Sequence, residues 1–326
     1  MTTGTTGEAG PAEAFQPVKS ASRTLDVLEA LAESRQRRSL VELARALEIP
    51  KSSLHGILRT MIRRGWVEAD ATGTRFGLGI RALQVGAAYL EADDATGLLA
   101  GVLDDLATQF GETVHLGRLD GAHVVYLAKR ESVHPLRLYS AIGRHLPAHA
   151  TALGKALLAE RPDEVVDRLL TWPLPALTRH TITDPDALHA ELATIRARGY
   201  AVDREENTEG MVCFAVAVPL HSPPVDAVSL SVPVSRLDPG SEERIVAALR
   251  AAVDQVRAAR ALLTDAGVLL LDEPTSHIDT RSERLIIDSL RRLRGTRTIV
   301  VATHSAALIE VADRVVEVAE AKAVAR

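Results

Sequence analysis

The sequence predicts an α+β protein, in which a small helical domain with a short β-hairpin precedes a larger domain of helices flanking an antiparallel sheet. Three observations lead to this prediction. Residues 51–66 carry apolar side chains at helical spacing, and residues 39–47 form a shorter pattern of the same kind directly upstream. Residues 113–127 alternate like two strands around Asp120-Gly121, a dipeptide typical of hairpin turns. A chain of 326 residues has room for about two or three domains.

Composition narrows the class of protein. The formal net charge is −5, so any surface that binds nucleic acid must be local. Cys213 is the only cysteine, which excludes an intrachain disulfide and favours a reducing compartment. No apolar run approaches a membrane-spanning length, and the N-terminus lacks the order of a signal peptide. We therefore expect a soluble, cytoplasmic protein with no membrane partner.

The first elements of the chain are a tail and a helix. Residues 1–18 have no apolar period and are expected to be disordered. A helix follows, for which Ser22 is the expected N-cap and Leu25, Leu28 and Leu31 the apolar face. Three arginines follow the end of this helix: Arg35, Arg37 and Arg38. They could contact phosphates, but a solvated loop is the simpler interpretation.

Residues 39–47 and 51–63 form two helices joined by the tight connection 48–50, the spacing of a helix-turn-helix. The second helix is expected to present hydrogen-bond donors and cations on one face and to bury the other, which carries Leu54, Ile57, Leu58, Met61 and Ile62. From position 51 to 64 there are four basic residues and no acid, as a helix against phosphates and base edges requires. The alternative is the solvated face of an ordinary amphipathic helix. The expected DNA-contacting residues here are Lys51, Ser52, Ser53, His55, Arg59 and Arg63.

Two short alternating runs, 66–68 and 74–78, surround the turn 70–73 and predict a hairpin, or wing, with Arg75 near its tip as a further DNA contact. Helix, turn, helix and wing in this order are typical of a winged helix-turn-helix, which we assign to residues 19–79.

The larger domain follows a linker helix at 80–94 and covers residues 95–259. It begins with a helix that stops at Gly111. We expect further strands at 136–140, 200–203, 213–220 and 227–232. Helices are expected at 186–198, ended by Gly199, and from Ser241 to about Arg260. Residues 149–158 form a loop entering a helix, whose first backbone N–H groups favour an anion.

With these elements in order, residues 19–259 resemble the isocitrate lyase regulator (IclR) family of bacterial transcription factors. The motifs that carry the resemblance are IPKSSLH at 49–55, the hairpin ending at 125–127, PAHATALGKA at 147–156, RGYAVDREE at 198–206 and SLSVP at 229–233.

The resemblance implies a homodimer or homotetramer whose winged helices bind double-stranded operator DNA, as repressor or activator. It also implies a GAF-like domain that binds a small organic acid as effector. By the matching motifs, the resemblance implies that six residues line the effector pocket: Ala152, Leu153, Asp203, Cys213, Ser229 and Ser231. If the family resemblance is set aside, the alternative interpretation of Cys213 is a small buried apolar residue. The alternative for Ser229 and Ser231 is that they lie on an exposed strand face. Their two-residue spacing, however, puts both hydroxyls on one side, as a polar pocket wall needs.

The reading helix departs from the family at one position, because members commonly have Arg where this chain has Gly56. The glycine removes a guanidinium and weakens the helix by up to about 1 kcal/mol relative to alanine. We expect operator affinity or specificity to be affected.

From about residue 260 to 326 the sequence changes character. VLLLDEPT at 268–275 resembles the Walker B strand of an ABC transporter ATPase, SHID at 276–279 its D-loop, and TIVVATH at 298–304 its switch-histidine strand. In an intact ATPase, Asp272 would orient Mg²⁺, Glu273 would polarise water and His304 would sense the γ-phosphate. The phosphate-binding loop G-x-x-x-x-G-K-[ST] is missing, so we expect a vestigial fragment of marginal stability.

These observations are compatible with three functional hypotheses. An effector-responsive DNA-binding regulator leads, with no enzymatic activity and no cofactor. An ATP-binding transporter subunit is the alternative suggested by the tail. A metal protein or enzyme is suggested only by His145 and His149, but the intervening Pro147 argues against a helix that would pair them.

Overall fold

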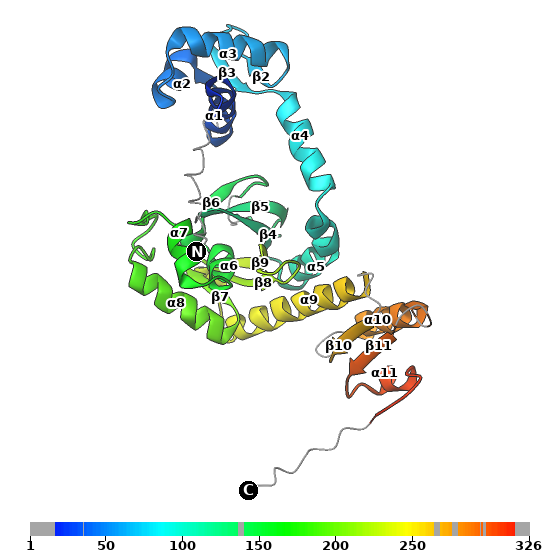
Figure 1. Ribbon diagram of the computed structural model, residues 1–326. Helices are drawn as coiled ribbons and strands as arrows, with labels where there is room; N and C mark the ends of the chain where they lie inside the picture. The colour runs from blue at the N-terminus through cyan, green and yellow to red at the C-terminus, as the bar shows by residue number, and fades with distance from the viewer. Residues whose placement is uncertain are drawn as a thin grey trace, which may run out of the picture. The chain divides into compact units, whose positions relative to one another are not determined.

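The computed structural model describes residues 17–34, 36–135, 140–263, 268–275, 280–293, 295 and 298–316. The chain divides into two compact units, residues 1–92 and 93–326 (Figure 1). Three predictions fall on residues that the structure does not describe. They are residues 136–139 of the strand predicted at 136–140, the D-loop at 276–279, and residues 1–16 of the predicted tail.

The N-terminal unit consists of three short helices and a small antiparallel sheet of order β1-β3-β2. Its core gathers one face of each helix, including Val27, Leu43 and Leu54, with Phe76 from the hairpin. The elements are α1 (Lys19–Glu33), β1 (Arg38–Ser39), α2 (Leu40–Ala46), α3 (Lys51–Arg63), β2 (Val67–Ala69) and β3 (Arg75–Leu78).

The ends of these helices correct one prediction. The expected N-cap Ser22 lies inside α1, where its N–H donates to the Val18 carbonyl, because the helix begins three residues earlier at Lys19. The start of α2 carries a capping box instead: the Ser39 hydroxyl accepts from the Glu42 N–H at 3.3 Å, and the Glu42 carboxylate accepts from the Ser39 N–H at 2.6 Å.

Strand β1 was not predicted, because a strand of two residues carries no period that a sequence pattern can reveal. Arg38 pairs with Phe76 and Ser39 with Arg75, so part of the arginine cluster expected to be a loop forms the third strand of the wing sheet.

Helix α4 (Ile80–Glu91) follows the wing and contains no buried residue. Four of its large apolar side chains are more than half exposed: Ile80, Leu83, Val85 and Tyr89. The N-terminal unit therefore presents an apolar helix surface.

The second unit is built on a six-stranded sheet of order β6-β5-β4-β9-β8-β7, in which every neighbouring pair is antiparallel. Strand β9 is buried along its whole length, since helices cover both faces of the sheet. The strands are β4 (Thr113–Asp120), β5 (His123–Arg130), β6 (His145–Pro147), β7 (Ala201–Arg204), β8 (Met211–Val218) and β9 (Asp226–Pro233). Strand β6 was not predicted.

The helices of this unit are α5 (Asp94–Phe110), α6 (Ala152–Ala159), α7 (Asp163–Leu169), α8 (Pro185–Arg198) and α9 (Ser241–Leu263), with short 3-10 turns at Ala148–Ala150 and Val234–Arg236. The predicted stops at Gly111 and Gly199 are both left-handed caps, with φ of 66° and 75°.

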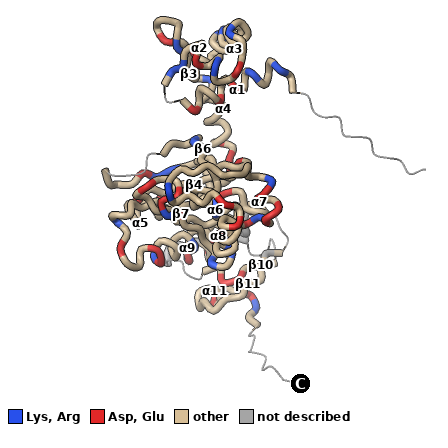
Figure 2. Tube along the Cα trace, turned by 90° about the vertical axis from the view of Figure 1, so that its left-hand side faces the viewer, with Lys and Arg blue, Asp and Glu red and all other residues tan. Residues whose placement is uncertain are grey.

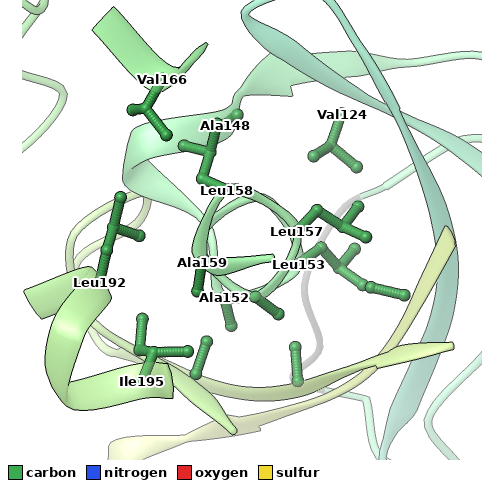
Figure 3. Packing of buried hydrophobic residues seen from close by; sticks show 14 of the residues in the cluster. Val124, Ala148, Ala152, Leu153, Leu157, Leu158, Ala159, Val166, Leu192 and Ile195 are labelled. Atoms are coloured by element: carbon green, nitrogen blue, oxygen red, sulfur yellow. The ribbon is translucent and has the colours of Figure 1, made fainter. Parts of the chain in front are cut away.

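Helix α6 is the centre of the core. All eight of its residues are buried, and Figure 3 shows its apolar side chains pointing outward in several directions, toward Val124, Val166 and Leu192. Gly154 makes this packing possible: a Cβ there would lie 2.1 Å from the backbone oxygen of Ala148, so only glycine lets α6 approach the preceding turn.

The C-terminal segment contains β10 (Val268–Asp272), α10 (Thr280–Leu293), β11 (Thr298–Ala302) and α11 (Ala306–Glu310). The two strands pair in parallel, and a small core forms from Leu271, Leu308 and three residues of α10. Val268, Leu270 and Val300 are exposed, so one side of this strand pair is apolar surface. Among the described residues, no helix is long and apolar enough to cross a membrane.

Candidate functional site

Helix α3 separates an apolar face from a polar one. Leu54, Leu58 and Met61 are buried in the core of the N-terminal unit. Ile57 is half-buried, whereas Ile62, expected in the core, is 37% exposed. This expectation was wrong because Ile62 lies about 80° around the helix from Leu54, at the edge of the buried arc.

The six predicted DNA-contacting residues of α3 are all exposed: Lys51, Ser52, Ser53, His55, Arg59 and Arg63. In the described part of the chain, none of the three cations Lys51, Arg59 and Arg63 forms an ion pair or a side-chain hydrogen bond. Figure 2 shows basic positions along this helix. Unpaired cations on one exposed helix face can contact phosphates without first breaking internal salt bridges.

Arg75 differs from these residues. It is the first residue of β3, beside the turn that Asp70 closes by accepting hydrogen bonds from the Thr74 and Arg75 N–H groups at 2.9 and 3.0 Å. Its guanidinium donates to the Arg37 carbonyl at 3.1 Å and lies 3.9 Å from the Glu42 carboxylate. The side chain is thus directed toward the start of α2 rather than being unpaired like the cations of α3.

Gly56 lies on the exposed side of α3, and a Cβ built there would meet nothing within 4 Å. A side chain at this position would therefore extend from the same surface as the cations without a steric cost.

The six residues predicted for the effector pocket all line one cavity in the second unit: Ala152, Leu153, Asp203, Cys213, Ser229 and Ser231. Its volume, about 20 Å³ for the centre of a water-sized sphere, has room for about one water molecule. An organic ligand is larger than this volume, so the residues that line the cavity would have to move outward to admit one.

The sheet brings the polar side chains together. Asp203, Cys213 and Ser231 are direct neighbours across strands β7, β8 and β9, and Ser229 follows two residues before Ser231 on the same face. The serines are 3% and 2% exposed, so the alternative of an exposed strand face is wrong. The Cys213 thiol donates to the Ser231 hydroxyl at 3.2 Å, and burial raises its pKa, so it stays protonated.

Five further residues line the cavity and were not predicted: Tyr126, Thr151, Asn207, Thr208 and Met211. Thr151 is the N-cap of α6, and its hydroxyl accepts from the Gly154 N–H at 3.0 Å. That cap was recognisable in the sequence as a threonine before a helix. Asn207 and Thr208 come from an irregular turn whose position at the cavity no local pattern reveals.

The start of α6 provides free donors at the cavity. In the described part of the chain, the backbone N–H groups of Ala152 and Leu153 make no hydrogen bond, as expected for the first turn of a helix. The Asn207 side-chain nitrogen is a buried donor without a partner in the same part of the chain. These groups suit an acceptor such as a carboxylate.

A buried ion pair lies behind the cavity. Lys155 on α6 is 1% exposed, and its ammonium lies 2.5 Å from Glu206 Oε1 and 3.6 Å from Glu191 Oε1. Glu191 also accepts from Arg198 at 3.0 Å. The cation is thus matched to carboxylates on the 205–210 turn and on α8, and it holds both against α6.

Asp203 is the cavity's own carboxyl group. Its Oδ1 accepts from the backbone N–H groups of Glu206 and Asn207 at 2.7 and 3.3 Å. Burial, followed by the nearby charge of Glu206, raises its pKa to about 7 despite these hydrogen bonds.

The three residues predicted as a vestigial ATPase motif lie at or just after the ends of β10 and β11. Glu273 follows β10, and its carboxylate lies 2.8 Å from the Nδ1 of His304 and 3.4 Å from the Thr303 hydroxyl. Asp272 is the last residue of β10 and pairs with Ala302. Asp272 and His304 are exposed, whereas Glu273 is half-buried.

His145 and His149 do not share a helix: one lies in β6 and the other in a 3-10 turn, where its ring contacts the Pro175 carbonyl at 3.0 Å. Among the described residues there is no group of three His, Cys, Asp or Glu side chains that could hold a metal ion.

A winged helix with an exposed cationic face, joined to an α+β unit with a polar cavity, defines the class of ligand-responsive DNA-binding regulators. The family models are specific. One described as the bacterial transcriptional regulator IclR C-terminal matches residues 87–258, and one for the IclR helix-turn-helix domain matches residues 20–71. The chain belongs to the IclR family of transcriptional regulators.

Individual relatives agree. The chain is 34% identical to the HTH-type transcriptional regulator XynR of Escherichia coli, over 68% of this chain and 88% of that protein. It is also 34% identical to the transcriptional repressor IclR of Escherichia coli, over 70% of this chain and 86% of the repressor. A crystal structure of a transcriptional regulator from Rhodococcus sp. RHA1, 29% identical, superposes with a TM-score of 0.65 over 76% of this chain and all of that one.

The C-terminal segment has a different similarity. Residues 245–310 match a model of an AAA domain (AbiEii toxin, Type IV TA system). The IclR C-terminal model ends at residue 258, so residues 259–310 of this match lie beyond it.

Proposed function

We propose that α3 binds the major groove of an operator, with Lys51, Arg59 and Arg63 contacting phosphates and Ser52, Ser53 and His55 contacting base edges or the backbone. The observation that supports this is the exposure of all six side chains without ion pairing of the cations. Arg75 is the proposed wing contact, and it must exchange its contact with Glu42 to reach DNA.

We propose a small carboxylic acid as the effector. Free N–H donors at the start of α6, the Asn207 amide and a wall of hydroxyls provide hydrogen bonds for a carboxylate and a second polar group. Binding would widen this small cavity and displace the 205–210 turn, which is the physical route from effector to domain movement.

We infer a homodimer or homotetramer in the cytoplasm. The apolar surface of α4 supports self-association, because four large apolar side chains on one exposed helix are costly to leave in water. Two winged helices in a dimer would read half-sites about one helical turn apart, or a multiple of that.

DNA binding is tested by fluorescence anisotropy on the protein's own promoter region, at a series of salt concentrations. The logarithm of the binding constant should fall linearly with the logarithm of salt concentration, because each phosphate contact releases counterions. Binding that is insensitive to salt, or no binding at low micromolar protein, would remove α3 as the reading helix.

Effector binding is tested separately by thermal shift with acetate, lactate and benzoate. A ligand that binds only the folded state raises the melting temperature with its concentration. Ser231→Ala should reduce the shift, whereas Ser235→Ala, outside the cavity, should leave it unchanged.

We infer that the chain has no enzymatic activity and needs no cofactor. Asp272, Glu273 and His304 stand in stretches that resemble the Walker B and switch-histidine motifs of an ATPase. The sequence, however, has no phosphate-binding loop to hold a triphosphate. ATP binding that is lost in Asp272→Asn would overturn this inference and revive the transporter ATPase.

A further inference from the structure

We propose that Asp203 meets the effector as a protonated carboxylic acid, so that the cavity takes up a small carboxylate together with one proton. This inference rests on the proposed function of the cavity, and it specifies the charge state in which that site binds its ligand.

The two oxygens of Asp203 have different surroundings. Oδ1 accepts hydrogen bonds from the N–H groups of Glu206 and Asn207, which turn it toward the backbone. Oδ2 makes no hydrogen bond in the described part of the chain. Asp203 is 3% exposed and lines the cavity, so Oδ2 is the oxygen that remains for a ligand.

No cation is available to neutralise Asp203 inside the cavity. The described residues that line it include no lysine, arginine or histidine. The nearby buried cation, Lys155, already pairs with Glu206 and lies 3.6 Å from Glu191. With Lys155 and Glu206 cancelling each other, an ionised Asp203 would be a surplus negative charge in a buried site.

The other groups around Asp203 are uncharged. Tyr126 reaches the cavity from β5, Cys213 from β8 and Ser231 from β9. Burial raises the pKa of both the Tyr126 hydroxyl and the Cys213 thiol, so neither carries a negative charge near neutral pH. Behind Tyr126, His115 of β4 stacks on its ring, and burial lowers the pKa of this histidine to about 3, so it is neutral as well.

The consequence for a carboxylate ligand is a choice between repulsion and a hydrogen bond. Beside an ionised Asp203, two carboxylates would share a buried site, which is strongly unfavourable. With the proton on Oδ2, Asp203 donates an O–H···O⁻ hydrogen bond to the ligand, a strong class of hydrogen bond. The proton comes from solvent: one is taken up per ligand where Asp203 was ionised beforehand, and none where it was already protonated.

The first experiment is isothermal titration calorimetry of the full chain with acetate, lactate and benzoate, at pH 8 in phosphate and in Tris. The different ionisation enthalpies of the buffers report the protons exchanged. We expect uptake of about one proton per carboxylate bound, and affinity that falls about tenfold per pH unit above the pKa of Asp203. Binding without proton uptake, with equal affinity from pH 6 to 9, would overturn the inference.

Asp203→Asn provides a variant of the same size that cannot titrate but still offers an N–H donor. It should bind the same acids with no proton exchange and with an affinity independent of pH over this range. Glu209→Gln is the matched control, because Glu209 is exposed on the same turn and does not line the cavity. It should keep the pH dependence of the wild type; if Asp203→Asn also keeps it, another group carries the proton.

A ligand-free measurement tests the ionisation itself. The unfolded Asp203 loses its proton near pH 4, whereas the folded residue holds it until about pH 7, so the cost of ionising it in the folded state develops between these values and is complete above them. The melting temperature of the wild type should therefore fall relative to Asp203→Asn from pH 4 to 7.5, then stay parallel. A constant difference would overturn the inference. If none of the acids binds the wild type at any pH, the proposed function of the cavity fails instead, and this inference with it.

Discussion

Helices α3 and α6 treat their positive charges in opposite ways. On α3, Lys51, Arg59 and Arg63 are exposed and unpaired among the described residues, above a core made by the other face. On α6, every residue is buried and the one cation, Lys155, is enclosed between two carboxylates. The cations of α3 therefore remain available to bind a polyanion, whereas Lys155 is neutralised by carboxylates of the segments packed against α6.

The difference has an energetic basis. An exposed cation loses little on moving from water to a phosphate and gains entropy from released counterions. A buried cation is expensive to bring out of water and is tolerated only with its partners in place. Binding of DNA and sensing of a small molecule therefore use the same side-chain chemistry at opposite extremes of burial.

The largest expected effect is at the buried cation. Lys155→Met leaves Glu206 as an unpaired buried carboxylate, and the effector unit should lose about 3–5 kcal/mol of unfolding free energy. Urea denaturation measures the loss. The double variant Lys155→Met/Glu206→Gln should recover a large part of it; equal instability of the two would show that packing of the lysine stem, not its charge, holds the turn.

The next effect is steric and concerns how closely α6 approaches the preceding 3-10 turn. Gly154→Ala puts a Cβ against the backbone of Ala148, which cannot yield, and should cost about 1–3 kcal/mol or more. Gly101→Ala on α5 is the matched control, since a Cβ there meets nothing within 4 Å. It should be neutral or stabilising by up to about 1 kcal/mol, and similar melting temperatures for the two variants would contradict the close approach.

A smaller effect is expected on α3. Arg59→Ala should lower operator affinity and reduce the salt slope by about 1, as loss of one phosphate contact does. The control is Arg168→Ala, an exposed arginine on α7 of the other unit, which should leave both quantities unchanged. An unchanged slope in Arg59→Ala would mean that α3 does not face the phosphates through this residue.

The smallest effect separates helix stability from charge at position 56. Gly56→Ala should stabilise the N-terminal unit by about 0.5–1 kcal/mol without changing the salt slope, because the site is open and helical. Gly56→Arg should add a steeper slope of about 1 and tighter operator binding. Identical slopes for the two variants would show that this position lies away from the DNA backbone.

The sequence predicted the parts of the fold that depend on local pattern. The helices of the winged unit, the hairpin at Asp120-Gly121 and the glycine stops at 111 and 199 all follow from spacing and caps within a few residues. The family motifs also selected six residues that the structure gathers around one cavity. Strands β1 and β6 escaped prediction because elements of two or three residues have no period.

The sequence by itself determined the longer helices and strands, the glycine stops at 111 and 199, and that the exposed side of α3 carries cations without acids. Only the tertiary structure decided the electrostatic state of each charge. Arg75 and the cations of α3 look alike in sequence, yet Glu42 lies near the first and no carboxylate pairs with the others among the described residues. Lys155, inside a helix motif, is buried against carboxylates 36 and 51 positions away. Burial and pairing depend on contacts between distant segments, and these contacts set the energy of a charge.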